Sequence, residues 1–127
     1  MNDNGERKRV LIADDQNTVL MLERMMLENA GYAVVVARNG AEAVNKAATE
    51  KPHIILLDVT MPQMDGYDAC RAIRALPETR TVPILMVTTR SEFVNMQAGF
   101  AAGCTEYVTK PFNAVELVET VRRYLVE

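Results

Sequence analysis

Five short apolar runs alternate with longer segments in which apolar residues recur every three or four positions. The runs are rich in Val, Ile and Leu, and such continuous apolarity is typical of strands buried on both faces of a parallel sheet. This pattern predicts strands over 9–13, 32–37, 54–58, 84–87 and 106–109. The other segments predict helices over 16–30, 39–50, 67–76, 91–102 and 113–126.

The strict alternation of strand and helix, with short connections, predicts the fold class. A parallel sheet with right-handed crossovers carries helices on both faces, so we expect an α/β domain with a doubly wound five-stranded sheet. Each helix should turn one apolar face toward that sheet. The residues expected on these inner faces are Val19, Leu22, Met26 and Ala30 in the first helix, Ala41, Val44 and Ala48 in the second, and Val115, Val118, Val121 and Leu125 in the last.

Polar residues stand at or just past the ends of four of these strands. Asp14 and Asp15 follow the first strand, and the third ends on Asp58. Thr88 and Lys110 follow the fourth and fifth. Because the carboxyl ends of parallel strands meet at one edge of the sheet, where ligands bind in open α/β sheets, these side chains should come together there. We interpret Asp58 as the candidate nucleophile.

The residue types at this edge fit phosphoryl transfer. Three carboxylates in close contact repel one another unless a cation neutralises them, and an all-oxygen ligand set favours Mg²⁺, with Mn²⁺ as a substitute. A carboxylate can then attack a phosphoryl group and form an acyl phosphate, while Lys110 and Thr88 offer a cation and a hydroxyl for its oxygens. Each residue alone has an ordinary alternative, such as a helix cap or a turn acid. Their joint placement at successive strand ends supports the hypothesis.

Composition narrows the classes of protein and partner. The chain has 127 residues and a net charge of −3, and 49% of its residues are apolar, which fits one folded domain over 9–127 after a polar tail at 1–8. No basic stripe indicates direct binding to nucleic acid. No apolar run approaches the length of a membrane span, and the N-terminus lacks the apolar stretch of a signal peptide. We therefore expect a cytoplasmic location and no membrane partner.

Four other residues have structural interpretations. Cys70 and Cys104 lack a CxxC spacing and are expected to be reduced residues of the core or of a helix. His53 begins the third strand, on the rim opposite the acids, and is interpreted as structural. Gly99 lies inside the fourth helix, where glycine costs about 1 kcal/mol relative to alanine. It is either a deliberately loose switch element or an ordinary residue explained by simple close packing or neutral drift.

Four motifs at the strand ends are specific in combination: LIADD at 11–15, LLDVTMPQMDG at 56–66, MVT at 86–88 and YVTKPF at 107–112. Together they resemble the receiver domain of two-component response regulators, over residues 9–126. Since no output domain follows Glu127, the resemblance is to a stand-alone, chemotaxis-regulator-like receiver. It implies a flavodoxin-like (βα)5 fold with strand order 2-1-3-4-5.

The resemblance also implies a role for each acid. Asp58 would accept a phosphoryl group from the phosphohistidine of a histidine kinase or a phosphotransfer protein. Asp15 and Asp58 would bind Mg²⁺ directly, together with the backbone carbonyl of Thr60, and Asp14 would act mainly through a metal-bound water. Such a protein is expected not to be an enzyme, because it catalyses only its own phosphorylation and dephosphorylation.

Other positions would transmit or time the signal. Thr88 and Lys110 would contact the phosphoryl group, and Tyr107 would turn inward on activation. Without the resemblance, Tyr107 is equally well a half-buried strand aromatic. Thr60 and Arg90 lie two residues beyond Asp58 and Thr88, at positions that tune the phosphoryl lifetime in the family. We hypothesise that they do so here by controlling the attack of water.

The first helix carries more apolar side chains than one inner face needs, among them Leu20, Met21 and Met25. In the family this region docks the phosphodonor, beside a Lys110-Pro111 bond that is commonly cis, although trans is the default for a sequence alone. These side chains are either buried core or a docking surface, for which methionine is well suited. The expected docking residues are Val19, Leu20, Met21, Pro111 and Phe112.

Other functions fit the sequence less well. The alternative is a phosphohydrolase with an Asp nucleophile on a related sheet, but that class expects Asp-x-Asp after the first strand. A flavin binder expects a phosphate-cradling loop there, where Asp14 and Asp15 would repel the phosphate. A purely structural pseudo-receiver is disfavoured because no motif residue is missing. The kinase, the downstream target, the pathway and the phosphoryl lifetime stay open, and we expect a monomer or a weak dimer.

Overall fold

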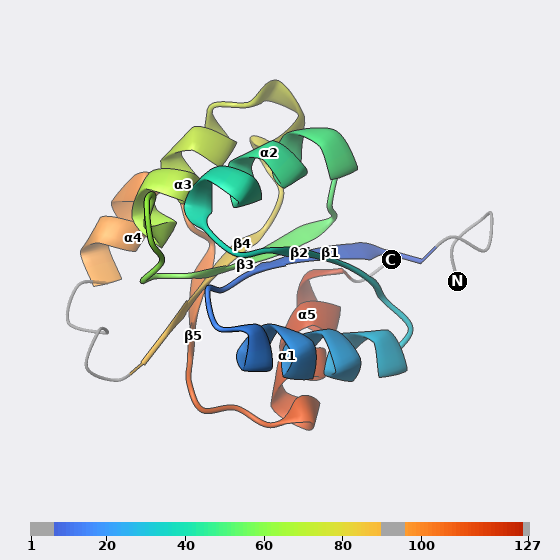
Figure 1. The fold of residues 1–127 in the computed structure, drawn as a ribbon. Coiled ribbons are helices and arrows are strands. Elements are labelled where there is room, and N and C mark those ends of the chain that lie inside the picture. The colour runs from blue at the N-terminus through green and yellow to red at the C-terminus, as the bar shows by residue number, and fades with distance from the viewer. Residues whose placement is uncertain (1–6, 90–95, 126–127) are drawn as a thin grey trace.

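Five parallel strands form a single sheet in the order β2-β1-β3-β4-β5 (Figure 1). The computed structural model describes residues 7–89 and 96–125. The strands are β1 (Arg9–Ala13), β2 (Ala33–Ala37), β3 (Ile54–Asp58), β4 (Ile84–Thr88) and β5 (Glu106–Thr109). Every pairing between neighbours is parallel. The predicted α/β class and the strand order 2-1-3-4-5 are therefore confirmed.

The helices cover the sheet in two layers, with α1 and α5 on one face and α2, α3 and α4 on the other (Figure 1). They are α1 (Asn17–Asn29), α2 (Gly40–Glu50), α3 (Gly66–Arg74), α4 (Met96–Ala102) and α5 (Ala114–Tyr124), with a short 3-10 helix η1 at Pro77–Thr79. The expected start of the fourth helix at Ser91 lies outside the described residues. No helix among the described residues is long and apolar enough to cross a membrane.

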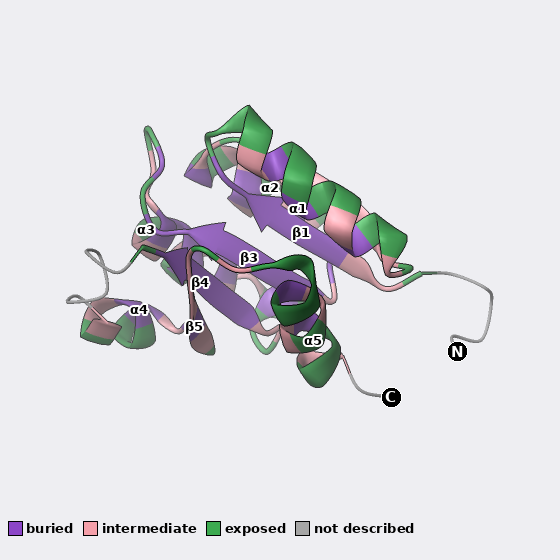
Figure 2. Ribbon diagram, turned by 90° about the horizontal axis from the view of Figure 1, so that it is seen from below, coloured by how far each residue is buried: buried purple, intermediate pink, exposed green. Residues whose placement is uncertain are grey.

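The central strand β3 shows why its sequence is continuously apolar. Ile54 and Leu56 belong to the core under α1 and α5, whereas Ile55 and Leu57 belong to the core under α2 and α3. Successive side chains point to opposite faces of a strand, and both faces are covered here. Figure 2 shows the central strands as buried and the outer turns of α1 and α5 as exposed.

The predicted inner face of α1 is wrong by one position. The buried residues are Leu20, Glu23 and Leu27, while Leu22 is 50% exposed. Val19, Met26 and Ala30 are half-buried at the margin of the true inner face. The error arises because a carboxylate occupies the middle of that face, so the neighbouring stripe is more continuously apolar.

The inner faces of α2 and α5 also differ from the prediction. In α2 the buried positions are Ala43 and Ala47, and Ala41 is exposed, because a sequence rich in alanine gives little contrast between faces. The predicted Val44 and Ala48 are half-buried. In α5 the buried residues are Leu117 and Val121, with Val118 and Leu125 packed at the core margin and Val115 exposed. Val121 is thus confirmed, Val115 was wrong, and Leu117 was missed.

Helix starts follow side-chain caps that the sequence supplies. The side chains of Asn39 and Asp65 accept hydrogen bonds from backbone N–H groups in the first turns of α2 and α3. Asn113 and Glu116 form a reciprocal capping box at the start of α5. These contacts satisfy N–H groups that have no partner within the helix, so α2, α3 and α5 each begin at a defined residue.

The residues interpreted as structural have such roles. Cys70 and Cys104 are free and buried, and the Cys70 Sγ donates to the Ala102 carbonyl at 3.4 Å. The His53 Nδ1 accepts a hydrogen bond from the backbone N–H of Arg9 at 2.9 Å, which joins the starts of β1 and β3. This is the rim opposite the strand ends that carry the acids.

Candidate functional site

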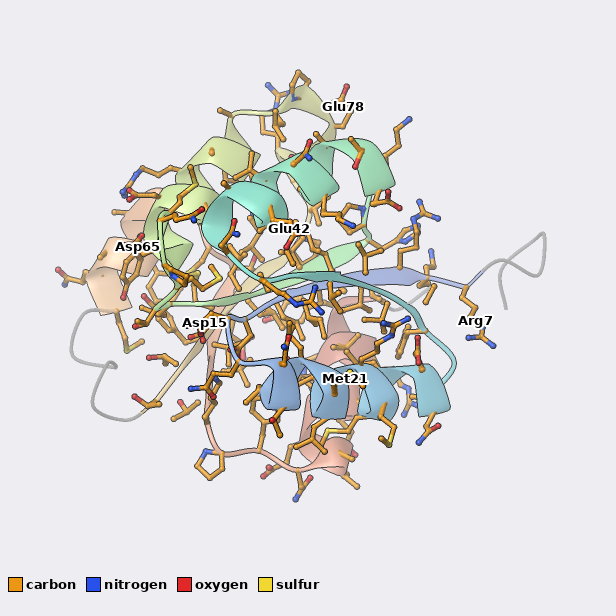
Figure 3. All side chains as sticks on the ribbon, viewed as in Figure 1. Arg7, Asp15, Met21, Glu42, Asp65 and Glu78 are labelled. Atoms are coloured by element: carbon orange, nitrogen blue, oxygen red, sulfur yellow. The ribbon has the colours of Figure 1, made fainter. Side chains whose placement is uncertain are left out.

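Three aspartates meet at the carboxyl edge of the sheet. Asp14 and Asp15 follow β1, and Asp58 ends the neighbouring strand β3, where Ala13 lies opposite Leu57. One carboxylate oxygen from each aspartate lies within 4.8 Å of those of the other two. Asp14 and Asp58 are buried and Asp15 is exposed, at the point where β1 leads into α1 (Figure 3). The parallel register therefore brings together acids that are more than 40 residues apart in sequence.

Lys110, which directly follows β5, completes this cluster. Its Nζ donates to the Asp14 Oδ2 at 3.0 Å and lies 3.6 Å from the Asp58 Oδ2. Its backbone N–H bonds to the Thr88 carbonyl, which fixes the end of β5 beside β4. Burial lowers the pKa of Lys110, but the hydrogen bond to Asp14 and the charges of Asp58 and Asp14 outweigh burial and raise it. The ammonium therefore stays charged, as a role toward a phosphoryl group requires.

The electrostatics of the cluster fit a hard divalent cation. The cluster holds three carboxylates and one ammonium, so it carries excess negative charge, and two of the acids are buried. All the donors are oxygens, which Mg²⁺ prefers, and Mg²⁺ is usually held by one or two carboxylates with waters and phosphate oxygens. Asp14, Asp15 and Asp58 are the described residues that fit such an ion.

The loop after β3 holds Asp58 in place. The backbone N–H of Thr60 points at the Asp58 Oδ1 at 3.3 Å, and that of Gly66 bonds to the Val59 carbonyl at 2.9 Å. A Cβ at Gly66 would overlap the Asp58 carbonyl, so only glycine allows α3 to start this close to the strand. Thr60 is exposed beside the acid. Arg90, its expected partner in timing, lies outside the described residues.

Thr88 and Tyr107 lie on the side of the sheet edge that leads to α4. Thr88 is fully buried at the end of β4, and its Oγ1 donates to the Thr89 carbonyl at 3.1 Å. Tyr107 is 8% exposed, its hydroxyl donates to the Met96 carbonyl at 3.0 Å, and its ring packs edge-on against Phe100 at 5.4 Å. Burial and a hydrogen bond with Tyr67 raise the pKa of Tyr107. The aromatic ring is therefore turned inward, under α4.

Gly99 makes room for this inward tyrosine. A Cβ at position 99 would overlap the Tyr107 hydroxyl and lie 2.7 Å from its Cζ. Real side chains do not approach so closely, so the interior glycine of α4 is required by the tyrosine that lies against it. Of the two interpretations offered by the sequence, close packing is the one that the contacts support.

The residues expected to dock a partner are only partly at the surface. Val19, Pro111 and Phe112 line a groove between α1 and the chain after β5, and Met21 is exposed on the outer side of α1 (Figure 3). Leu20 is 2% exposed and packs in the core, so its assignment to a docking surface was wrong. Leu22 and Met25, which were not among the expected docking residues, are exposed on the same helix. The bond between Lys110 and Pro111 is cis.

Sequence reasoning missed Glu23. This carboxyl lies on the inner face of α1 between Leu20 and Leu27 and is 5% exposed. Its pKa is raised from 4.5 to about 7 because burial disfavours the charged form, and the negative charge of Asp14 adds to this effect while Lys110 opposes it. The only signal in the sequence was its spacing from the two leucines, at three and four residues.

Comparison with known proteins agrees with this arrangement. Residues 10–122 match the family model described as the response regulator receiver domain. The transcriptional regulatory protein ResD of Bacillus subtilis is 39% identical over 123 residues, which cover 97% of this chain and 50% of ResD. The protein PilH of Pseudomonas aeruginosa is 35% identical over 117 residues, covering 92% of this chain and 97% of PilH. The chain thus spans about half the length of the first curated relatives it matches.

A solved structure bears on the acidic cluster. The receiver domain of the sensor histidine kinase PA1611 from Pseudomonas aeruginosa superposes with a TM-score of 0.88 and 30% identity, over 95% of this chain and 99% of that domain. That structure was determined with a magnesium ion coordinated in its active site cleft. The fold that places three aspartates together here is therefore one in which a relative holds Mg²⁺.

Proposed function

Because the chain belongs to the response regulator receiver domain family, we propose that it accepts a phosphoryl group on Asp58 from the phosphohistidine of a histidine kinase or a phosphotransfer protein. The single observation that supports this most is the Lys110 ammonium, which lies 3.0 Å from Asp14 and 3.6 Å from Asp58 beside three clustered carboxylates. Phosphoryl transfer needs positioning and charge neutralisation more than covalent chemistry, and these residues supply both.

In the proposed reaction an oxygen of the Asp58 carboxylate attacks the phosphorus of the donor. A P–O bond forms, the P–N bond to the donor imidazole breaks, and its electron pair returns to the ring nitrogen. Asp15, Asp58 and the carbonyl of Thr60 would hold Mg²⁺, with Asp14 acting through a metal-bound water. The ion, or Mn²⁺ in its place, would neutralise charge on the transferred group. Lys110, whose ammonium already lies 3.6 Å from the Asp58 Oδ2, would stabilise the same charge.

The proposed switch connects this site to α4 and β5. The Thr88 hydroxyl and Lys110 would both turn to the phosphoryl oxygens. Tyr107, which is already inward, would be held in that position and would change the surface presented to a downstream protein. Thr60 and Arg90 would set how long the acyl phosphate survives by governing access of water. The proposal concerns the receiver domain, as a monomer or weak dimer in the cytoplasm with no direct contact to nucleic acid.

The experiment is direct phosphorylation of the full chain with a small phosphodonor and Mg²⁺, followed by intact mass measurement. We expect a gain of one phosphoryl group that disappears with EDTA and in Asp58→Asn. Glu78→Gln, which changes an exposed carboxylate on η1, is the matched control and should be phosphorylated normally. A phosphoryl group that persists in Asp58→Asn, or none in the unchanged protein, would refute the proposal.

A further inference from the structure

A groove of about 240 Å³ lies between α1 and the residues that follow β5. Val19, Leu22 and Met26 form its wall on α1, and Pro111 and Phe112 face them. Small-molecule sites usually enclose about 300–1,000 Å³, so this groove suits a single inserted side chain better than a whole ligand. Its mainly apolar lining would cover the stem of such a side chain.

Two ionisable side chains, Glu23 and Lys110, also line the groove. Lys110 directs its ammonium to Asp14 and Asp58. Glu23 differs: it is 5% exposed, and within residues 7–89 and 96–125 its carboxyl receives no hydrogen bond and forms no ion pair. An acceptor buried without a donor is costly, so this carboxyl gains from any donor that enters the groove.

The charges around the groove favour a cationic donor over a neutral one. Four carboxyl groups lie in or beside it, and one ammonium is already shared between two of them. A divalent cation at the aspartates would reduce this negative charge without reversing it. A charge-assisted hydrogen bond to a carboxylate is roughly twice as strong as a neutral one.

We propose that this groove receives a basic side chain of the protein that docks on α1, with the aliphatic stem against the apolar walls and the cationic head hydrogen-bonded to the Glu23 carboxylate. An arginine fits best, because its guanidinium is weakly hydrated and its fork of donors matches a carboxylate. The inference rests on the proposed function in one respect, which is that the docking partner is the phosphodonor. Since a group with a pKa near 7 is about half protonated in neutral solution, binding should release on average about half a proton per complex.

The test is a titration of the full chain with n-butylguanidinium, followed through backbone amide signals in saturating Mg²⁺, which keeps the probe from the aspartates. The neutral analogue n-butylurea has similar shape and donors but no charge. Above neutral pH we expect saturable shifts in α1 and at residues 110–112, and binding at least about tenfold tighter for the guanidinium, as expected for a hydrogen bond to a charged group. Affinity for the cation should fall as the pH drops through the pKa of Glu23, which bound Mg²⁺ lowers by offsetting the charges of Asp14 and Asp58.

Two variants assign the effect to one carboxyl. Glu23→Gln should reduce n-butylguanidinium affinity about tenfold, to the level of the urea, since only the charge is removed. Glu28→Gln, which changes an exposed carboxylate on the same helix, should leave it unchanged. Equal affinity for the two probes, or undiminished binding to Glu23→Gln, would overturn the proposal. No phosphoryl transfer occurs in this titration, so its failure is distinct from a failure of Asp58 to be phosphorylated.

Discussion

Glu23 should make the stability of the fold depend on pH. Its pKa rises from 4.5 in the unfolded chain to about 7 in the fold, and each unit of difference corresponds to about 1.4 kcal/mol. Because the folded-state value is the higher one, the proton favours the fold. The free-energy cost of burying the ionised carboxylate is absent below about pH 4.5, grows as the pH rises, and reaches about 3 kcal/mol above pH 7. That is a large part of the 5–15 kcal/mol by which typical domains are stable.

The assay is urea unfolding from about pH 4.5 to 8 in EDTA, comparing the unchanged protein with Glu23→Gln. Glutamine does not ionise, so the comparison isolates the pH dependence that Glu23 introduces. The difference in unfolding free energy should therefore change by about 3 kcal/mol in favour of the variant across this range. Bound Mg²⁺ should reduce the change, because it offsets the charges of Asp14 and Asp58 that add to the cost.

Two further variants test whether the pH dependence comes from the buried carboxyl of Glu23. Glu28→Gln, with an exposed carboxylate in an i,i+4 pair with Arg24, should differ from the unchanged protein by only a few tenths of a kcal/mol at every pH. Glu23→Leu should be more stable than the unchanged protein near pH 8, since it removes a buried charge without leaving a cavity. Parallel pH profiles for the unchanged protein and Glu23→Gln would show that this carboxyl is not buried as described.

Three other outcomes can be measured. Gly99→Ala should gain about 1 kcal/mol of helix propensity. It should also displace the Tyr107 ring, which the new Cβ would overlap, and so lose a hydrogen bond and an aromatic contact worth about 1 kcal/mol each. Tyrosine fluorescence and amide shifts in α4 would report the movement of the ring. Gly40→Ala should lower the unfolding free energy by about 1–3 kcal/mol, because a Cβ there would overlap a backbone carbonyl of the loop after β3, as denaturant midpoints would show. Replacing Thr60 or Arg90 with alanine should change the rate at which the acyl phosphate hydrolyses, measured by loss of the phosphoryl mass after the donor is removed, and unchanged rates would refute their role in timing.

The strands and the strand-end cluster could be predicted because their signals are local and unambiguous. A run such as 54–57 has no polar member, and the change to an acid at Asp58 marks the end of a strand in the one direction that a parallel sheet allows. Bringing Asp14 to Asp58 also requires β1 and β3 to be neighbours. The resemblance implied that strand order, whereas the alternation of strands and helices alone did not. Lys110 follows β5 at the same edge of the sheet, and its Nζ lies 3.6 Å from the Asp58 Oδ2.

The inner faces of the helices could not be predicted as well as the strands, because a helix face is recognised only by the difference in hydrophobicity between two sides of the same helix. The inner face of α1 is identified by contrast with its outer face, but Leu22 and Met25 are exposed while Glu23 is buried, so the contrast is inverted at these positions. Apolar residues are usually buried and ionisable residues are usually exposed. Both rules are broken at functional places, where an apolar residue can serve a partner-binding surface and an ionisable residue can be buried beside a binding site. The misassigned turn of α1 is therefore also the one that faces the groove and the acids.

Gly99 shows a different limit of prediction from sequence, because its role depends on the rotamer of Tyr107, which no sequence pattern encodes. With Tyr107 turned outward, its ring would no longer lie against position 99, and a glycine there would only weaken the helix. With Tyr107 inward, its hydroxyl reaches the Met96 carbonyl across the space that a Cβ would fill. The two interpretations make opposite predictions for Gly99→Ala: a stabilised α4 with an unmoved tyrosine in the first case, and a displaced ring in the second. The contacts favour the second, and the amide and fluorescence changes of that variant decide between them.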